Sequence, residues 1–428
     1  MRPSANKRVV VTGLGMVTAL GLEVSDNWDK ALAGVSGVSK ISLPGTANSP
    51  VQAVAAVNET DWGRIAGEFP EEPASPVEQE RRTMFTLWAV KKAMIDARLF
   101  NSGGCRERFG TVLAAGLGIN RLEDIARWMR AGEFDLAAFS REYHQVCGDS
   151  IIRNNSHRAA AVAARRFSLF GPNATITTAC ASATQAIGTA FRMIRDGEAD
   201  VIAAGGADSM INPIGLVFFV LLQAACPGSE NVTQLCRPFD RKRSGLIMGE
   251  GAGIVILEEY EHAIKRGARI YAEAAGYAST MDAYQVTAPI PDGSGAEGAM
   301  RAALKDAALE TDAIDYINAH GTSTKLNDEA ETAAITKVFK ERAVAISSSK
   351  SMIGHLLAAS GGPEFIFTVL SVANDEIHPT INLTNPDPKC PLDYVPLVKR
   401  SKTVRAAISN SFGFGGQNAS IIVKKLGA

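Results

Sequence analysis

The sequence predicts an α/β protein built from two similar halves, and three observations lead to this fold class. Residues 175–191 (TITTACASATQAIGTAF) and 344–360 (VAISSSKSMIGHLLAAS) share one pattern, in which β-branched strand residues precede a small polar turn and an apolar helix containing glycine. Apolar strand runs alternate with helical segments along the chain. The length of 428 residues is enough for two such units. We expect halves at 1–267 and 268–428, with a site between them.

Composition excludes several functional classes. A net charge of −1 argues against nucleic acid or a membrane surface as the main partner. The apolar run 214–225 is too short to span a bilayer and is bracketed by Pro213 and Pro227, so it is expected to be buried. Six cysteines without a C-x-x-C pair indicate reduced thiols rather than disulfides or a zinc site. The apolar N-terminal stretch is interpreted as a first strand, not a signal peptide, and a cytoplasmic protein is expected.

The first half begins with a strand at Val9–Thr12, which Gly13 and Gly15 are expected to turn. This G-x-G lacks the third glycine of a dinucleotide-binding loop. A helix is expected to start at Ser75–Glu78, where a capping residue precedes a proline. The other expected elements are strands at 111–115, 174–178, 201–204 and 254–257, a helical segment at 121–140, and helices at 156–166, 181–191 and 260–266.

The second half is predicted to repeat this plan. Ser294 and Glu297 form a capping box that opens a helix. The remaining expected elements are strands at 269–279, 315–320, 344–350, 404–409 and 419–423, a helix at 328–339, an apolar segment at 365–370, an extended loop at 378–396 and a glycine-rich loop at 410–418.

Cys180 falls at a predicted strand-to-helix turn. Helix N–H groups and the positive end of the helix dipole favour the thiolate there, which is the form that attacks a carbonyl carbon. A lone cysteine is more commonly a small buried core thiol. His320, Lys350, His355 and the loop 412–416 also fall just past strand ends, where ligands collect in open α/β sheets. The shared location of these residues past strand ends favours the interpretation of Cys180 as a nucleophile over that of a core thiol.

His320 and His355 complete a candidate set of one thiol and two imidazoles. Individually, each histidine is more often a hydrogen-bonded core residue than a catalyst. Metal binding is not expected, because no ligand spacing such as H-x-x-x-H is present. The loop GFGGQN at Gly413–Asn418 is either a tight turn or a source of backbone N–H groups for an oxyanion.

Several separated motifs resemble those of the elongating, type II β-ketoacyl-acyl-carrier-protein synthases. They are TTACASA around Cys180, NAHGTST at His320, SSKSMIGHLLAASG through Lys350 and His355, and NSFGFGGQN near the end of the chain. Residues 236–253 and 282–296 are also similar, and the resemblance runs from Val9 to Val423. It implies the thiolase fold, with two pseudo-symmetric βαβαβαββ halves in a five-layer αβαβα arrangement, and a homodimer.

The resemblance also implies a ping-pong condensation. Cys180 would accept an acyl group from acyl carrier protein, with its own backbone N–H and that of Phe414 forming the oxyanion hole. His320 and His355 would bind the malonyl thioester carbonyl, promote decarboxylation and stabilise the enolate. The substrates would arrive on the phosphopantetheine arm of acyl carrier protein, and no permanently bound cofactor or metal is implied.

Further roles are implied residue by residue. Lys350 and Glu364 match a buried supporting pair of the family, Thr322 and Thr324 match its pantetheine contacts, and Phe414 matches its gate residue, with Phe412 in the same substrate-binding loop. Arg81 and Arg82 are expected to face the acidic carrier protein.

The chain departs from the family pattern in several places. Ile353 and Gln417 stand where threonine is common, and Lys325–Asn327 replaces a common Pro-x-Gly. The apolar stretch from Gly215 replaces one rich in glycine and alanine, so Val217, Phe218 and Val220 add bulk where the acyl pocket and dimer interface of the family lie. Phe218 and Phe219 are the candidate substrate-binding residues of this stretch. We expect altered selectivity for acyl length or shape.

Three alternatives are weighed against this interpretation. A degradative thiolase has a second cysteine in its C-terminal glycine loop, which is absent here, and a chalcone-synthase-like enzyme has asparagine in place of His355. A non-catalytic partner subunit of the chain-length-factor type loses the cysteine, whereas this chain keeps Cys180 and both histidines. A specialised ketosynthase of secondary metabolism stays open, as do the acyl length and the cognate carrier.

Overall fold

The computed structural model describes residues 6–43, 46, 48–70, 80–100, 106–118, 126–145, 155–340 and 342–427. The larger elements of the first half are β1 (Val9–Val17), α1 (Val24–Leu32), α2 (Glu59–Glu68), α3 (Arg81–Asp96), β4 (Phe109–Ala115), α7 (Arg158–Phe167), β7 (Asn173–Ile176), α8 (Ser182–Arg195), β8 (Val201–Asp208), α9 (Pro213–Leu221), β10 (Gly251–Glu259) and α10 (Tyr260–Lys265). Shorter elements are β2 (Ser39–Lys40), β3 (Ala53–Ala55), β5 (Met129–Arg130), β6 (Glu133–Phe134), α5 (Leu136–Glu142) and β9 (Met248–Gly249).

The second half contains β11 (Ala272–Met281), α11 (Ser294–Ala307), β12 (Ile314–Asn318), α12 (Lys325–Phe339), β13 (Ala345–Ser347), α13 (Lys350–Ile353), α14 (Gly361–Asn374), β14 (Glu376–Ile377), β15 (Arg400–Ser401), β16 (Ala406–Gly413) and β17 (Gln417–Lys424).

The strands of both halves join in one ten-stranded sheet, and the two halves have the same topology. From its edge inward, the first half runs β7-β4-β8-β10-β1, and the second runs β13-β12-β16-β17-β11. In each half the three outermost strands are parallel and the other pairs are antiparallel. Strands β1 and β11 pair antiparallel where the halves meet. This confirms the predicted βαβαβαββ repeat.

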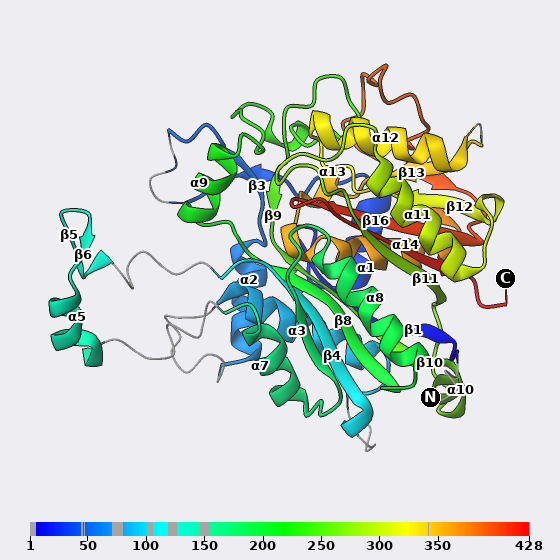
Figure 1. The fold of residues 1–428 in the computed structure, drawn as a ribbon, viewed down its shortest axis with the longest axis horizontal. Helices are drawn as coiled ribbons and strands as arrows, with labels where there is room; N and C mark the ends of the chain where they lie inside the picture. The colour runs from blue at the N-terminus through cyan, green and yellow to red at the C-terminus, as the bar shows by residue number, and fades with distance from the viewer. Residues whose placement is uncertain are drawn as a thin grey trace.

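Five layers follow from this arrangement. Helices α8 and α14 pack against each other and against strands of both halves, so they form the central layer (Figure 1). Helices α3 and α7 cover the outer face of the first half, and α11 and α12 cover that of the second. Buried apolar residues gather in three large clusters that correspond to the two outer interfaces and the central layer. The core therefore holds the ends of β7 and β13 in fixed positions on either side of the central helices.

The expected turn at Gly13 and Gly15 is wrong, because β1 continues through both glycines to Val17. These residues allow close approach of α3 instead. A Cβ atom at Gly13 would lie 2.3 Å from the Ala93 carbonyl oxygen, and one at Gly15 would lie 2.0 Å from that of Ala89. The glycines thus reflect helix-on-sheet packing rather than chain reversal.

Other local expectations also need correction. The helix start at Ser75–Glu78 lies outside the described residues, and the described part of α3 begins at Arg81 with Glu80 as its cap. Ser294 is the first residue of α11 rather than its cap, so the capping box does not form. Residues 129–134 form the β5–β6 hairpin instead of a helix. The predicted loop 410–418 is mostly strand, with only Phe414–Gly416 between β16 and β17.

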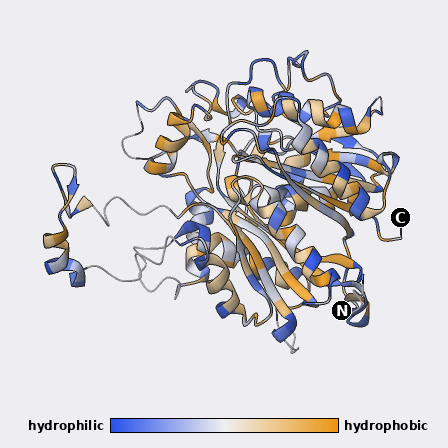
Figure 2. Cartoon of the chain, viewed as in Figure 1, coloured by the Kyte–Doolittle hydropathy of each residue, from blue (hydrophilic) through white to orange (hydrophobic). Residues whose placement is uncertain are grey.

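Helix α9 corrects the expectation that residues 214–225 are buried. Asn212 caps this helix by accepting a hydrogen bond from the Gly215 N–H, and Phe219 faces the core. Val217, Phe218, Leu221 and Leu222 are exposed, and Figure 2 shows α9 as an apolar helix at the surface. Among the described residues, none of the helices combines the length and apolarity needed to cross a bilayer.

Candidate active site

Cys180 stands in a sharp connection between β7 and α8. Ala179, directly before it, has a φ of 48°, which lies in the left-handed region that non-glycine residues rarely adopt. The Ser182 hydroxyl accepts a hydrogen bond from the Thr178 N–H and donates one to the Ala179 carbonyl. These bonds hold the connection in its unusual conformation and leave the Cys180 side chain at the carboxyl end of the sheet.

His355 comes from the corresponding connection in the second half. After β13 the chain forms the short helix α13, and Gly354 then turns it with a φ of 69°. The His355 Nδ1 atom accepts a hydrogen bond from the Leu357 N–H at 3.0 Å and lies 2.7 Å from the Ser360 hydroxyl. Because Nδ1 is an acceptor, the proton of the neutral ring is on Nε2.

His320 follows β12, and its backbone and ring are both anchored. The N–H groups of His320 and Gly321 donate to the carboxylate of Glu331 on α12. The Lys350 ammonium donates to the His320 carbonyl at 2.6 Å and to its Nδ1 at 3.2 Å, and it also pairs with Glu364. As in His355, an occupied Nδ1 leaves the proton on Nε2.

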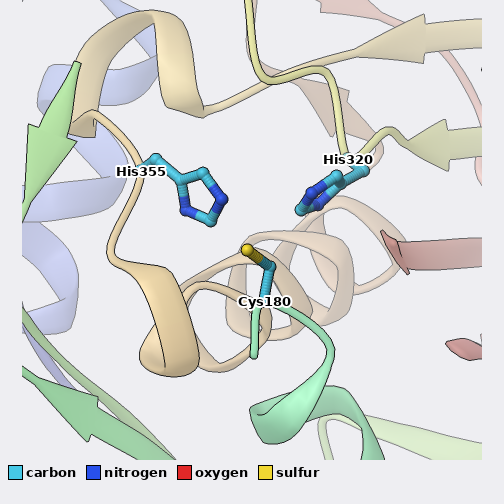
Figure 3. Close-up of side chains that lie close together, drawn as sticks. All are labelled: Cys180, His320 and His355. Carbon is cyan, nitrogen blue, oxygen red and sulfur yellow. The ribbon is translucent and has the colours of Figure 1, made fainter. Parts of the chain in front are cut away.

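The three side chains converge from both halves of the fold. Figure 3 shows the Cys180 sulfur pointing between the two imidazoles. Donor atoms of Cys180, His320 and His355 lie within 4.8 Å of one another, and the two rings are nearly perpendicular with centroids 5.4 Å apart. Three ligand atoms this close together could also hold a metal ion, although the spacing of these residues along the sequence did not indicate a metal site. The two Nε2 protons instead favour a pair of hydrogen-bond donors.

Electrostatics keep both imidazoles neutral. Burial lowers the pKa of His320 and of His355 well below the ordinary value, and the nearby charge of Lys350 lowers both further. Beside His320, burial raises the pKa of Glu364 to about 7, while the charge of Lys350 acts in the opposite direction. Neutral imidazoles that present N–H groups can stabilise a negatively charged oxygen without a preceding proton transfer.

The thiol differs from the expectation of a stabilised thiolate. Burial raises the pKa of Cys180 to about 11, although the charge of Lys350 and the Phe414 N–H both lower it. The side chain is only 9% exposed, so loss of solvation outweighs those two favourable contacts. Cys180 is therefore a thiol at neutral pH.

The glycine-rich turn lies directly against the nucleophile. A Cβ atom at Gly413 would lie 3.0 Å from the Cys180 backbone nitrogen, a tighter contact than most Cβ atoms make, so glycine favours this approach. The turn is tied to residues 282–290, since the Asn418 amide donates to Asp282 at 2.7 Å and the Gly415 N–H donates to the Val286 carbonyl at 2.6 Å. Phe414 is thereby held beside the sulfur.

One cavity of about 550 Å³ connects these residues to the surface. Its lining includes Cys180, His320, His355, Thr322, Thr324, Phe412 and Phe414. The hydroxyls of Thr322 and Thr324 lie 2.8 Å apart. Phe218 and Phe219 do not line this cavity; Phe219 packs in an adjoining apolar cluster with Leu357 and the partly buried Phe414.

The expected role of Arg82 in facing a carrier protein is wrong. Its side chain is buried, where it pairs with Glu80 and donates to the Gly116 carbonyl. Arg81 forms a two-point ion pair with Glu250 and stacks on Trp62. Both guanidinium groups are therefore held by structural partners in the described part of the chain.

Sequence reasoning missed three residues that position the site: Glu331, Ser360 and Asp208. Asp208 ends β8 and accepts the Ala358 N–H, which fixes the turn that orients His355. Burial raises the pKa of Asp208 to about 6 and that of Glu331 to about 7. The only signal for Glu331 was an acidic residue on the apolar face of a predicted helix.

Comparison with known protein families identifies the family to which a chain with this fold and site belongs. Residues 6–263 match the N-terminal domain of beta-ketoacyl synthases, and residues 271–384 match the C-terminal domain. The chain therefore belongs to the β-ketoacyl synthase family and is an acyl-transferring condensing enzyme.

Within this family, two curated relatives resemble the whole chain. The 3-oxoacyl-[acyl-carrier-protein] synthase 2 of Synechocystis sp. is 40% identical, with 98% of each chain covered. The protein of the same name from Staphylococcus aureus (strain N315) is 37% identical and covers 99% of this chain and 100% of that one.

Solved structures of ketosynthases superpose on this chain over nearly its whole length. A beta-ketoacyl synthase from Burkholderia phymatum superposes with a TM-score of 0.85 at 33% identity, covering 98% of this chain and 100% of that one. A type II polyketide ketosynthase bound to a hexaketide, in complex with its acyl-carrier protein, superposes with a TM-score of 0.87, also at 33% identity and with the same coverage.

Proposed function

We propose that this chain is a β-ketoacyl-acyl-carrier-protein synthase that condenses malonyl-carrier protein with an acyl group carried on Cys180. The observation that supports this most strongly is the convergence of one thiol and two neutral, Nε2-protonated imidazoles in a single cavity. Fatty acyl chains are the substrates we assign, because two full-length relatives are named 3-oxoacyl-[acyl-carrier-protein] synthase 2.

In the first half-reaction, the Cys180 sulfur attacks the acyl thioester carbonyl. The S–C bond to the carrier arm breaks, and the thiol proton leaves with the departing arm as its free thiol. Negative charge develops on the carbonyl oxygen, and the backbone N–H groups of Cys180 and Phe414 are the donors that we assign to it. The approach of Gly413 to the Cys180 nitrogen supports this assignment.

In the second half-reaction, the malonyl thioester loses its carboxylate as CO₂. The electron pair of the broken C–C bond passes into an enolate, whose oxygen accepts hydrogen bonds from the Nε2–H groups of His320 and His355. The enolate carbon then attacks the acyl carbon on Cys180. The C–S bond to Cys180 breaks, and the released thiolate takes up one proton. Lys350 and Glu364 act by holding His320 in place.

Acyl transfer can be tested by intact-protein mass spectrometry after incubation with a panel of acyl-carrier proteins. We expect a mass increase equal to one acyl group on the native chain and none on Cys180→Ser. Condensation with malonyl-carrier protein should be lost in the same variant, with its circular dichroism spectrum unchanged. Peptide mapping that places the acyl group on a residue other than 180 would contradict the proposal.

The same panel tests acyl selectivity. We propose that Phe219 restricts the acyl group through Phe414 and Leu357, with which it shares an apolar cluster, and that Phe218 contributes less because it is 43% exposed. Phe219→Gly should shift the preferred acyl length, whereas Phe218→Gly should shift it less. An unchanged preference in both variants would contradict this role.

We also infer a homodimer that forms through the edge strand β7. The strand is half-exposed, and its outer edge pairs with no other strand of the described chain. Its counterpart β13 is fully buried and covered by residues 393–395, since the Ile346 N–H donates to the Asp393 carbonyl. An open strand edge is a template for pairing with a second copy. Light scattering should give twice the chain mass.

A further inference from the structure

The orientation of the His355 ring depends on a residue with an unfavourable backbone conformation. Leu357 has a φ of 53°, in the left-handed region that leucine rarely adopts. In this conformation its N–H donates to His355 Nδ1 at 3.0 Å. Such a conformation persists only where the surrounding structure fixes it. The contacts that fix Leu357 therefore also decide which ring nitrogen of His355 carries the proton.

One of these contacts comes from Asp208, at the end of β8 in the first half of the fold. Its Oδ2 atom accepts a hydrogen bond at 3.1 Å from the N–H of Ala358, the residue directly after Leu357. Its Oδ1 atom accepts the Ser209 N–H at 2.9 Å. The Asp208 side chain is buried, so water does not readily replace either bond. The carboxylate thus holds the connection that carries His355 from the opposite half.

The Asp208 carboxylate is itself held in place from behind. A Cβ atom at Gly116 would lie 2.3 Å from Asp208 Oδ2, so the glycine provides the space that the carboxylate occupies. The buried guanidinium of Arg82 donates to the Gly116 carbonyl at 3.1 Å. Burial raises the pKa of Asp208, and the nearby charge of Arg82 lowers it. The start of α3 is therefore connected through Gly116 and Asp208 to the turn beside His355.

We propose that Asp208 is a positioning residue for the decarboxylation step, and that Arg82 supports it in this role. By holding Leu357 in place, Asp208 keeps the His355 proton on Nε2, where it can be donated to the enolate oxygen. This inference rests on the proposed function, in which that hydrogen bond is made only in the second half-reaction. Without the Ala358 contact, Leu357 is free to leave the left-handed region. The Nδ1 atom can then carry the proton and donate it to the Ser360 hydroxyl, which lies 2.7 Å away, and Nε2 has none for the enolate.

Acyl loading of Cys180 does not depend on this contact. The oxyanion donors that we assign to loading are the backbone N–H groups of Cys180 and Phe414, which belong to other segments. Burial raises the pKa of Cys180, and the negative charge of Asp208 adds to this effect, so loss of that charge does not weaken the nucleophile. The defect should therefore be confined to the second half-reaction.

Two variants disturb the Asp208 contact in different ways. Asp208→Asn keeps the size of the side chain but leaves one acceptor oxygen for the two N–H groups of Ala358 and Ser209. Gly116→Ala keeps the carboxylate but adds a methyl group that displaces it. Asp96→Asn is the matched control, because Asp96 also accepts a backbone N–H, from Leu14 at 2.9 Å, and does not line the cavity.

Each protein is first loaded with octanoyl-N-acetylcysteamine, and loading is measured by intact mass. Release of CO₂ from malonyl groups on a bacterial type II acyl carrier protein is then followed in a single turnover. We expect Asp208→Asn and Gly116→Ala to lower the saturating rate of CO₂ release about 10–100-fold, the range found when a group that orients a functional histidine is removed. Loading and the half-saturating carrier concentration should stay within about threefold, and Asp96→Asn should match the native chain.

The outcomes separate this inference from the proposed function. A rate of CO₂ release in Asp208→Asn equal to that of the native chain would overturn the positioning role. So would a loss of loading in proportion to the loss of CO₂ release, because it would show a general disturbance of the site. Absence of CO₂ release from the native chain would instead overturn the proposed function.

The tautomer of His355 gives a second readout, which a merely structural role of Asp208 would not change. Solid-state ¹⁵N NMR of protein with labelled histidines distinguishes protonated from unprotonated ring nitrogens, and His355→Gln identifies the signals of His355. We expect the proton on Nε2 in the native chain and a substantial fraction on Nδ1 in Asp208→Asn. An unchanged Nε2 proton in that variant would overturn the proposal.

The supporting role of Arg82 is tested in the same assay. Arg82→Gln removes the charge that favours the ionised Asp208, and it should lower the rate of CO₂ release several-fold. Arg82→Lys keeps the charge and should recover part of that loss, although lysine cannot reproduce the forked hydrogen bonding of arginine. Equal rates in the native chain and Arg82→Gln would show that Asp208 acts without Arg82 and would overturn this part of the proposal.

Discussion

The two halves of the molecule share one topology, yet the equivalent connections after their third strands perform different tasks. In the first half, five residues (177–181) join β7 directly to α8, and Cys180 is carried at the start of the helix. In the second half, thirteen residues (348–360) separate β13 from α14 and carry both Lys350 and His355. The longer connection has room to place a histidine opposite the thiol. One scaffold thus supplies a nucleophile from one side and hydrogen-bond donors from the other.

This division predicts that the half-reactions can be separated by mutation. We expect His320→Ala and His355→Ala each to lower condensation with malonyl-carrier protein about 10²–10³-fold, the usual cost of removing one donor to a developing negative charge. Acyl loading of Cys180, measured by intact mass, should remain within a few-fold. His262→Ala on α10 serves as a control, because this half-buried histidine contacts Glu258 and does not line the cavity. An equal loss of loading and condensation would mean that the halves do not divide the chemistry.

The charge pair beneath the second connection should matter for folding as well. Lys350 and Glu364 are both 1% exposed, so Glu364→Gln leaves a buried ammonium without its carboxylate. We expect the free energy of unfolding in urea to fall by about 3–5 kcal/mol. Lys389→Gln breaks the exposed pair with Glu329 and should cost less than about 1 kcal/mol. Similar costs in both variants would show that the Lys350 site is accessible to water.

The pH dependence of Cys180 alkylation tests which of two effects on the thiol pKa is larger. Burial raises this pKa, and the start of α8 lowers it by stabilising the thiolate. With a thiol pKa of about 11, the thiolate fraction rises about tenfold per pH unit from pH 7 upward. The rate of Cys180 modification by iodoacetamide should therefore still be rising steeply at pH 10, whereas in the urea-unfolded chain it should be half-maximal at pH ~8.5 and level off by about pH 10. A plateau at or below pH 9 in the folded protein would instead show that the start of α8 stabilises the thiolate more than burial opposes it.

Cys180 shows which properties of the site could be predicted from the sequence and which could not. The repeated pattern around Cys180 and Lys350 predicted the topology. Strands and helices can be predicted from the local spacing of apolar residues, which is visible in the sequence. Desolvation depends on neighbours that are distant along the chain, so the raised pKa of Cys180 and the role of Glu331 were not predictable from motifs. The same reason explains the burial of Arg82, because its partner Gly116 is distant along the chain.

A glycine in α8 lies where the two halves pack against each other. Its substitution gives the smallest predicted effect, a change in the free energy of unfolding. Gly188 lies in α8 of the first half, where a Cβ atom would meet the Tyr277 ring of β11 at 2.2 Å. Gly188→Ala should therefore lower the free energy of unfolding by about 1–3 kcal/mol, despite the better helix propensity of alanine.

The matched control is Gly63→Ala in α2, where no atom lies within 4 Å of the added Cβ. This variant should raise the free energy of unfolding by about 0.5–1 kcal/mol, because only the propensity term remains. Urea unfolding measures both. If Gly188→Ala were also stabilising, contact between α8 and β11 would be loose, and the halves would be coupled mainly through the β1–β11 pairing rather than through the central helices.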